Sequence, residues 1–393
     1  MYKSEILFGF LNDDNCKLML DMSKEKFSEG EISYITDRFE RVDKKVFFDL
    51  CREHELDGVV GGFALKYDLS LPDYWLDKYN KNKNHLSYLK EKAKEICCVM
   101  EQNGIPMVIL KNGGIMMDIV KDVAKCPMED IDSLIKKQDF LKAHEILIKI
   151  GFNFKFRSEY EFEKLDQAYR DGSTEYYITT PSGEKMWFEL SWRPIAGRWI
   201  RPDMEPDADS FINDSYIAEG TNVHILSPED NLLQVCIHTA KHSYVRAPGL
   251  RLHLDVDRIV SNKNINWELF FEKVESVHGK TAVYFSLYIP KILFGTEVPQ
   301  WVLDRLKPKK EKKILGQLAK AGLLHPKERK FSKIDFLKFQ TSIYDSFDDM
   351  YKTLYPGKDK MFELYNFNST LKIPFYIILR GLDLLGIRKR KKN

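Results

Sequence analysis

The sequence predicts an α+β protein, with a mixed sheet and helices flanked by helical N-terminal and C-terminal regions. Three observations lead to this prediction. Apolar residues recur at spacings of three and four up to about residue 102, alternate along short segments between 107 and 192, and return to helical spacing from Ser227. We therefore expect a helical region over 1–104, an α/β core over 105–220 and a helical region over 221–393 that ends in a basic tail.

Two segments of the N-terminal region have the apolar periodicity of amphipathic helices. They are "KKVFFDLCREHELDGVV" and "HLSYLKEKAKEICCVMEQNG". Gly104 is expected to end the second helix, because glycine commonly follows the last helical residue. Pro106 then precedes a short apolar segment, so a strand is predicted over Met107–Lys111.

The central segments alternate between strand and helix patterns. "DIDSLI" predicts a strand and "KKQDFLKAHEILIKIG" an amphipathic helix closed by Gly151. The stretches "FNFKFRS", "TEYYITT" and "KMWFELSW" then alternate as strands, with "PSG" as the turn between the last two. Beyond them, "SPEDNLLQVCIHTAKHSY" begins with a capping serine, a proline and two acids, which are typical of a helix start.

The composition favours a cytoplasmic globular protein. Of 393 residues, 61 are basic and 59 acidic, so the net charge of +2 gives no global attraction to nucleic acid, which is not an expected partner. Six cysteines lack metal-type spacing and are expected to be reduced, buried thiols. The N-terminal residues lack the pattern of a signal peptide, and no apolar run approaches the roughly 18 residues that span a membrane.

Asp130 and Asp132 lie two residues apart on the predicted strand of "DIDSLI". Alternate residues of a strand project to one face, so both carboxylates reach one small volume while Ile131 points into a core. Two hard oxygen ligands on a rigid strand form a site for a divalent cation with room for phosphate oxygens. A solvent-facing edge strand would show the same pattern, and this alternative stays open.

Two further features support the cation site. Gly113 and Gly114 form a predicted turn before a helix, where backbone N–H groups and the positive helix end attract a polyphosphate. Glu189 shares a strand face with Trp187 and Ser191 in "WFELSW". Such an acid is either half-buried and paired, or a third carboxylate that ligates a cation or takes a proton from an attacking hydroxyl.

The ordered motifs "VILKNGG", "CPMEDIDSLI", "WFELSW" and "HTAKH" resemble the poorly characterised nucleotidyltransferase-like family of the DNA polymerase β superfamily. The resemblance covers roughly residues 35–300 and implies a nucleotidyltransferase-type sheet. It implies that Asp130, Asp132 and Glu189 are the catalytic triad and hold Mg²⁺, with Mn²⁺ as the alternative ion. It also places a triphosphate, with ATP as the expected NTP, against the following residues: Lys111, Asn112, Gly113, Gly114, His238, Lys241 and His242.

Four positions depart from the family pattern. Asn112 stands where glycine usually follows the lysine, and Cys126 stands where an arginine often precedes Pro-Met. Ser133 interrupts the apolar run after the second aspartate, and Ser191 replaces the usual histidine after Glu189. All three carboxylates are retained, which favours an active site over a degenerate one.

The helix of "HTAKH" carries His238, Lys241 and His242 on one face, because they lie at i, i+3 and i+4. A metal site would need a further ligand, and a hydrogen-bonded structural face fits the two histidines as well. The resemblance favours a cationic wall over phosphates, which suits Lys241. It also selects Asp255 downstream, although we expect this residue to form a salt bridge with Arg251 or Lys241.

These observations predict a Mg²⁺-dependent nucleotidyltransferase that moves a nucleoside monophosphate from an NTP to an unidentified acceptor hydroxyl or phosphate, releasing pyrophosphate. The departures motivate an alternative, a catalytically silent nucleotide-binding or scaffold protein. A nucleic-acid-modifying enzyme is a second alternative, against which the near-neutral charge counts. The third is a peripheral membrane protein, because "IPFYIILRGLDLLGIRKRKKN" joins an apolar stretch to Arg388–Lys392 and could make a weak membrane contact.

Overall fold

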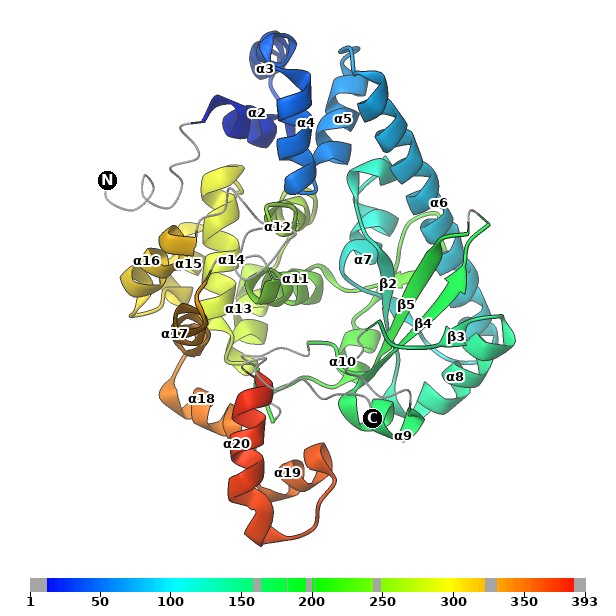
Figure 1. Cartoon of the computed structure of the whole chain (residues 1–393), viewed down its shortest axis with the longest axis vertical. Coiled ribbons are helices and arrows are strands. Elements are labelled where there is room, and N and C mark those ends of the chain that lie inside the picture. The colour runs from blue at the N-terminus through cyan, green and yellow to red at the C-terminus, as the bar shows by residue number, and fades with distance from the viewer. Residues whose placement is uncertain are drawn as a thin grey trace.

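The computed structural model has helices at both ends of the chain around one mixed sheet (Figure 1). It describes residues 13–157, 164–181, 183–195, 200–201, 203–242, 249–321 and 331–384. The predicted α+β class is therefore confirmed. All six cysteines are free, and five of them are buried, as expected for reduced thiols.

The N-terminal region consists of five described helices, and in three of them the side chain of the preceding residue caps the helix start. Asp13 and Asp43 accept backbone N–H groups of the helices they precede, and Ser28 forms a reciprocal capping box with Glu31. Trp75 is fully buried and joins three of the helices through ring contacts with Phe39, Phe47 and Phe48. The helices are α2 (Asp14–Met22), α3 (Glu29–Arg41), α4 (Lys44–Glu53), α5 (Asp57–Lys66) and α6 (Asp73–Gln102).

The seven strands are ordered β3-β4-β5-β2-β1-β7-β6. The central strand β2 is parallel to β5 and antiparallel to β1, and β4 and β5 form an antiparallel hairpin. The strands are β1 (Val108–Ile109), β2 (Asp130–Leu134), β3 (Asn153–Phe154), β4 (Ser173–Thr179), β5 (Lys185–Ser191), β6 (Tyr216–Ile217) and β7 (His224–Ile225).

The alternation of β2 and β5 gives the sheet one apolar and one polar face. Ile131, Phe188 and Leu190 are fully buried on the apolar face, along which α6 runs. Asp132 lies opposite Glu189 in the pairing of β2 with β5, so both project from the polar face. The sheet therefore fixes the two predicted acids side by side.

Two predicted strands are shorter than expected. The strand at Met107–Lys111 is reduced to β1, and Lys111 instead begins helix α7 (Lys111–Asp118). Gly113 and Gly114 lie inside α7, so the expected glycine turn before the helix is wrong. The strand expected over "FNFKFRS" is reduced to β3 because only Asn153 and Phe154 pair with β4.

Beyond the sheet hairpin the chain is mostly helical, and α11 packs against α12, α13 and α14. No helix among the described residues is long and apolar enough to cross a membrane. Three described helices accompany the sheet: α8 (Phe140–Lys149), α9 (Leu165–Asp171) and α10 (Ala208–Asn213). The C-terminal helices are α11 (Pro228–His242), α12 (Arg251–Asn262), α13 (Trp267–Ser276), α14 (Lys280–Leu293), α15 (Gln300–Leu306), α16 (Glu311–Ala321), α17 (Lys333–Ile343), α18 (Phe347–Leu354), α19 (Lys358–Tyr365) and α20 (Ile373–Leu384).

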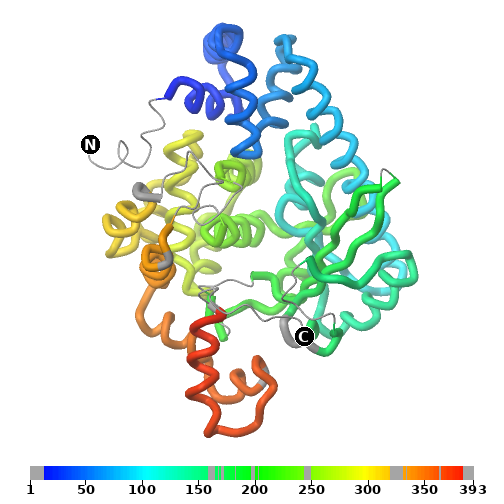
Figure 2. Tube along the Cα trace, in the orientation of Figure 1, coloured from blue at the N-terminus to red at the C-terminus, as the bar shows by residue number. Residues whose placement is uncertain are grey.

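Strand pairing and salt bridges connect the C-terminal part of the chain to the sheet and to the N-terminal helices. Strand β7 pairs with β1, so the sheet extends beyond residue 220, and the domain boundaries stay predictions. Arg258 of α12 pairs with Glu25 at 3.0 Å, and Arg251 pairs with Glu55 at 2.7 Å. The tube in Figure 2 shows this N-terminal blue segment beside the green of α12. The predicted basic tail, Arg388–Lys392, lies outside the described residues.

Candidate active site on the polar face of the sheet

Three carboxylates converge on the polar face of the sheet, as the sequence predicted. Asp130 and Asp132 come from β2 and Glu189 from β5, and one oxygen of each lies within 4.8 Å of the other two. All three side chains are partly buried. Three hard oxygen donors in this volume suit Mg²⁺ or Mn²⁺, which bind carboxylates and retain open positions for substrate oxygens.

Lys111 holds a positive charge against this cluster. Its Nζ lies 2.6 Å from Asp132 Oδ1, and its backbone, at φ +51°, has the left-handed conformation that is uncommon for a non-glycine residue. Burial lowers the pKa of Lys111, but attraction by Asp132, Glu189 and Asp130 outweighs it and raises the pKa above its usual value. Lys111 is therefore a fixed ammonium group beside the triad.

The site shifts the pKa values of Asp132 and Glu189 in opposite directions. Burial, with repulsion from Asp130 and Glu189, raises the pKa of Asp132 well above its usual value despite Lys111. Burial also acts to raise the pKa of Glu189, but Lys111, Asp132 and the Ser191 hydroxyl outweigh it and lower this pKa. Ser191 Oγ donates to Glu189 Oε1 at 3.2 Å. A divalent cation would relieve the mutual repulsion of these carboxylates, so the donor set fits a metal ion.

Two further charged residues at the site were missed by sequence reasoning. Arg157 Nη2 lies 2.5 Å from Asp130 Oδ2, and the same guanidinium donates to Glu175 Oε1 at 2.9 and 3.0 Å. Glu175 is opposite Glu189 in the hairpin of β4 and β5, so it is a fourth acid on this face. The alternation of "TEYYITT" placed Glu175 on a strand, but only the strand pairing shows that it adjoins the triad.

The residues at the start of α7 have different positions around the cavity. Asn112 Nδ2 donates to Pro127 O at 3.0 Å, which ties α7 to the loop before Asp130. A Cβ on Gly113 would lie 2.6 Å from Ile109 Cγ2, so this glycine permits close packing of α7 on β1. Lys111 and Asn112 line the cavity, whereas Gly113 and Gly114 are not among its described lining residues.

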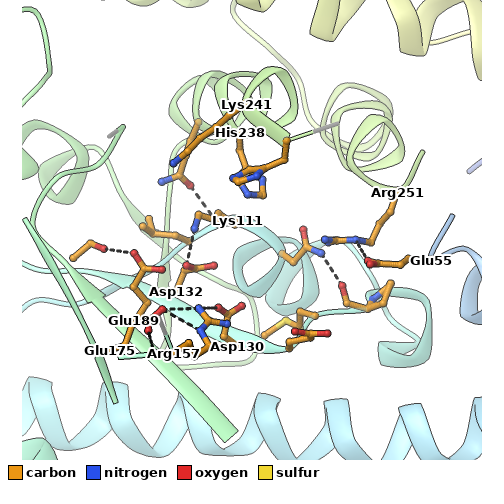
Figure 3. Close-up of a pocket in the computed structure, with 18 of the residues that line it drawn as sticks. Glu55, Lys111, Asp130, Asp132, Arg157, Glu175, Glu189, His238, Lys241 and Arg251 are labelled. Carbon is orange, nitrogen blue, oxygen red and sulfur yellow. Dashed lines mark hydrogen bonds and ion pairs between the residues drawn. The ribbon is translucent and has the colours of Figure 1, made fainter. Parts of the chain in front are cut away.

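Helix α11 forms the wall opposite the triad, and Figure 3 shows His238 and Lys241 above Lys111. His238, Lys241 and His242 all line a cavity of about 1060 Å³ that also contains the triad. The structure thus brings these residues close to the carboxylates. Burial, aided by the positive charge of Lys111, lowers the pKa of His238 well below its usual value, so its ring is neutral. Gln234, one turn earlier on α11, accepts from the backbone N–H of Lys111 at 3.2 Å.

The predicted salt bridge of Asp255 is confirmed. Its carboxylate is buried, 3.6 Å from Arg251 and 3.7 Å from Arg258. Arg251 reaches on to Glu55 at the edge of the cavity, as Figure 3 shows. Asp255 therefore positions Arg251 and does not itself join the triad.

Comparison with known proteins agrees with this geometry. A family model described as an uncharacterised nucleotidyltransferase matches residues 40–295. The chain belongs to this family. No curated protein and no solved structure matches it. Membership confirms the resemblance drawn from the motifs and implies an NTP substrate. The Asp130, Asp132 and Glu189 cluster could hold the divalent ion that nucleotidyltransferases generally use.

Proposed function

We propose that the protein is a Mg²⁺-dependent nucleotidyltransferase of the cytoplasm that transfers the nucleoside monophosphate of an NTP, ATP in the first instance, to an acceptor hydroxyl or phosphate. The observation that supports this most directly is the convergence of three carboxylate oxygens within 4.8 Å. In this reaction the acceptor oxygen bonds to the α-phosphorus, the bond to the β-phosphate oxygen breaks, and pyrophosphate leaves.

The carboxylates have distinct roles in the proposal. Asp130, Asp132 and Glu189 would hold the cation, which offsets the negative charge that develops on the phosphate oxygens. Glu189 is also the proposed base for an acceptor hydroxyl, because its lowered pKa keeps it ionised and able to accept the proton.

Polar and basic side chains around the triad would bind and orient the triphosphate. Lys111 is a fixed ammonium group 2.6 Å from Asp132, so it orients that carboxylate and presents positive charge to phosphate oxygens. Lys241 on α11 faces the same cavity from the opposite wall. The neutral ring of His238 can hydrogen-bond a phosphate or ribose oxygen without adding charge.

The proposal is tested by removing one carboxylate charge at a time. We expect Asp130→Asn and Asp132→Asn each to lower Mg²⁺-dependent NTP turnover by about a thousandfold, since several kcal/mol of charge stabilisation is lost. Asp304→Asn on the exposed side of α15 is the matched control and should retain activity. Circular dichroism checks that the variants fold. Wild-type turnover in both site variants would remove the mechanism.

A binding measurement separates the enzyme from the silent alternative. NTP with Mg²⁺ should raise the melting temperature of the wild type and not of Asp132→Asn, because the ligand stabilises only a state that binds it. The same shift without turnover across many acceptors would favour a nucleotide-binding scaffold. Strongly salt-dependent RNA or DNA binding would instead favour a nucleic-acid-modifying enzyme.

A further inference from the structure

Positive charge is concentrated at the C-terminal end of the chain. Five of the last six residues are basic, Arg388 to Lys392. The whole chain carries +2, so the residues before this cluster carry a net charge of −3. The basic cluster is therefore a local feature and not part of a generally basic surface.

The last helix before this cluster has an uncovered apolar stripe. Leu371 is 91% exposed, Phe375 59% and Ile378 65%. They are spaced by four and three residues along α20 and the helical turn that precedes it, so they lie on one face. Leu382 is half-buried and continues the same face by one turn toward the basic cluster.

The opposite face of α20 is fixed to the protein, which keeps the stripe pointing outward. The ring of Tyr376 stacks on Phe367 with centroids 4.1 Å apart, and it also contacts Tyr365. Arg380 Nε donates to Thr353 O at 2.6 Å on α18. Figure 1 shows α20 beside α19 at the lower end of the molecule.

We propose that this face docks on an anionic membrane surface, with Leu371, Phe375 and Ile378 inserted at the boundary of headgroups and acyl chains. The basic cluster would contact the lipid headgroups beside them. Stable peripheral binding usually needs two signals, and an apolar stripe followed by five basic residues supplies both. The contact is separate from the proposed nucleotidyl transfer, because Leu371, Phe375 and Ile378 are not among the described residues that line the cavity at the triad.

A second copy of the chain fits this stripe less well than a lipid surface. Three exposed side chains offer only a few hundred Å², whereas a stable interface between two copies buries roughly 1,200 Å² or more. A bilayer needs less apolar area because electrostatic attraction of the basic cluster adds to it. The charge pattern therefore favours anionic lipid.

The stripe is tested with the double variant Phe375→Ser/Ile378→Ser. Full-length protein is sedimented with vesicles of phosphatidylcholine alone or with roughly one-third phosphatidylserine. The wild type should bind the anionic vesicles only, and the variant should lose about tenfold in partition coefficient. Leu141→Ser/Ile148→Ser on α8 is the matched control, since these residues are 57% and 43% exposed, and it should bind as the wild type does.

The basic cluster is tested independently, in a segment outside the described helices. Neutralising Arg388, Lys389 and Arg390 to glutamine should weaken vesicle binding by roughly 10- to 100-fold and reduce its salt dependence. The control replaces Lys309, Lys312 and Lys313 with glutamine, which gives the same net charge from exposed positions. This control should bind as the wild type does.

Three results would overturn the inference. Equal loss in the two charge variants would mean that net charge alone drives binding. Unchanged binding of the Phe375→Ser/Ile378→Ser variant would exclude the stripe as the docking face. Self-association in lipid-free sedimentation that this variant abolishes would assign the stripe to a second copy. NTP turnover is measured in parallel, and its absence would affect the proposed function alone.

Discussion

Replacing Arg157 with glutamine should make the triad bind a divalent cation more tightly. Arg157 lies 2.5 Å from Asp130, so its guanidinium supplies part of the positive charge that a bound cation would place beside this carboxylate. Its pKa is raised, because Asp130 and Glu175 outweigh burial, and it stays charged. A bound ion must therefore tolerate this neighbouring positive charge or displace it from Asp130.

Coulomb's law gives the order of magnitude of the effect. For a divalent ion taken at about 5 Å from the guanidinium, repulsion at an effective dielectric of 20 is about 6–7 kcal/mol. Glu175 neutralises much of the Arg157 charge, and the Arg157 side chain is 35% exposed, so solvent screens part of the repulsion that is left. A remainder of about 1.4–2.8 kcal/mol corresponds to roughly 10- to 100-fold tighter metal binding in Arg157→Gln.

Titration with Mn²⁺ alone, followed by electron paramagnetic resonance, measures this affinity without any need for turnover. Glu175→Gln should have the opposite effect and weaken Mn²⁺ binding. It removes a negative charge beside Glu189, and Arg157 is then paired with Asp130 but no longer with a charged Glu175. A purely structural role for the pair would not move the two affinities in opposite directions. Arg193→Gln is the control, since Arg193 lines the same cavity but pairs with Glu205. Mn²⁺ affinity in Arg157→Gln equal to or below that of the wild type would refute the reasoning.

Two further predictions concern stability. Gly113→Ala should lower the free energy of unfolding by about 1–3 kcal/mol in urea, because the new Cβ would approach Ile109 Cγ2 to 2.6 Å, whereas Gly30→Ala meets nothing within 4 Å and should not destabilise. Burial raises the pKa of Asp257 to about 6, above its unfolded value, so the folded state binds the proton more tightly and stability should rise as the pH falls from 7 toward 5. The full effect is up to about 3 kcal/mol, and Asp257→Asn, which keeps the Thr296 hydrogen bond, should flatten this part of the pH profile of unfolding.

Local patterns were sufficient to predict the central part of the site. The alternation of Asp130, Ile131 and Asp132 determines which side chains share a face once the segment is a strand, and the alternation around Glu189 does the same on β5. The helical spacing of His238, Lys241 and His242 correctly placed them on one face of α11. In each case a period of two or 3.6 residues carries the information.

Long-range pairing could not be predicted in the same way. Arg157 follows a strand of only two residues, and nothing near it in the sequence indicates that it reaches Asp130. Glu175 becomes part of the site only because the β4–β5 register places it beside Glu189. Strand β7 is likewise too short to show alternation, although its pairing with β1 extends the sheet.

The four departures from the family pattern support the site instead of interrupting it. Asn112 holds the loop before Asp130 through Pro127 O, and the Cys126 thiol donates to Asn112 O at 3.4 Å, so both secure the connection between α7 and β2. Ser133 Oγ donates to Glu189 O at 2.9 Å and joins the two strands that carry the triad. Ser191 donates directly to the Glu189 carboxylate.

These contacts weaken the reason for preferring a silent scaffold. A degenerate site would be expected to lose the bonds that orient its acids, since nothing would then maintain their geometry. Here Ser191 helps keep Glu189 ionised, which is the state that both a metal ligand and a base require. The substitutions thus replace the family's usual side chains with others that bond to the same acids and loops, and they favour the enzymatic proposal.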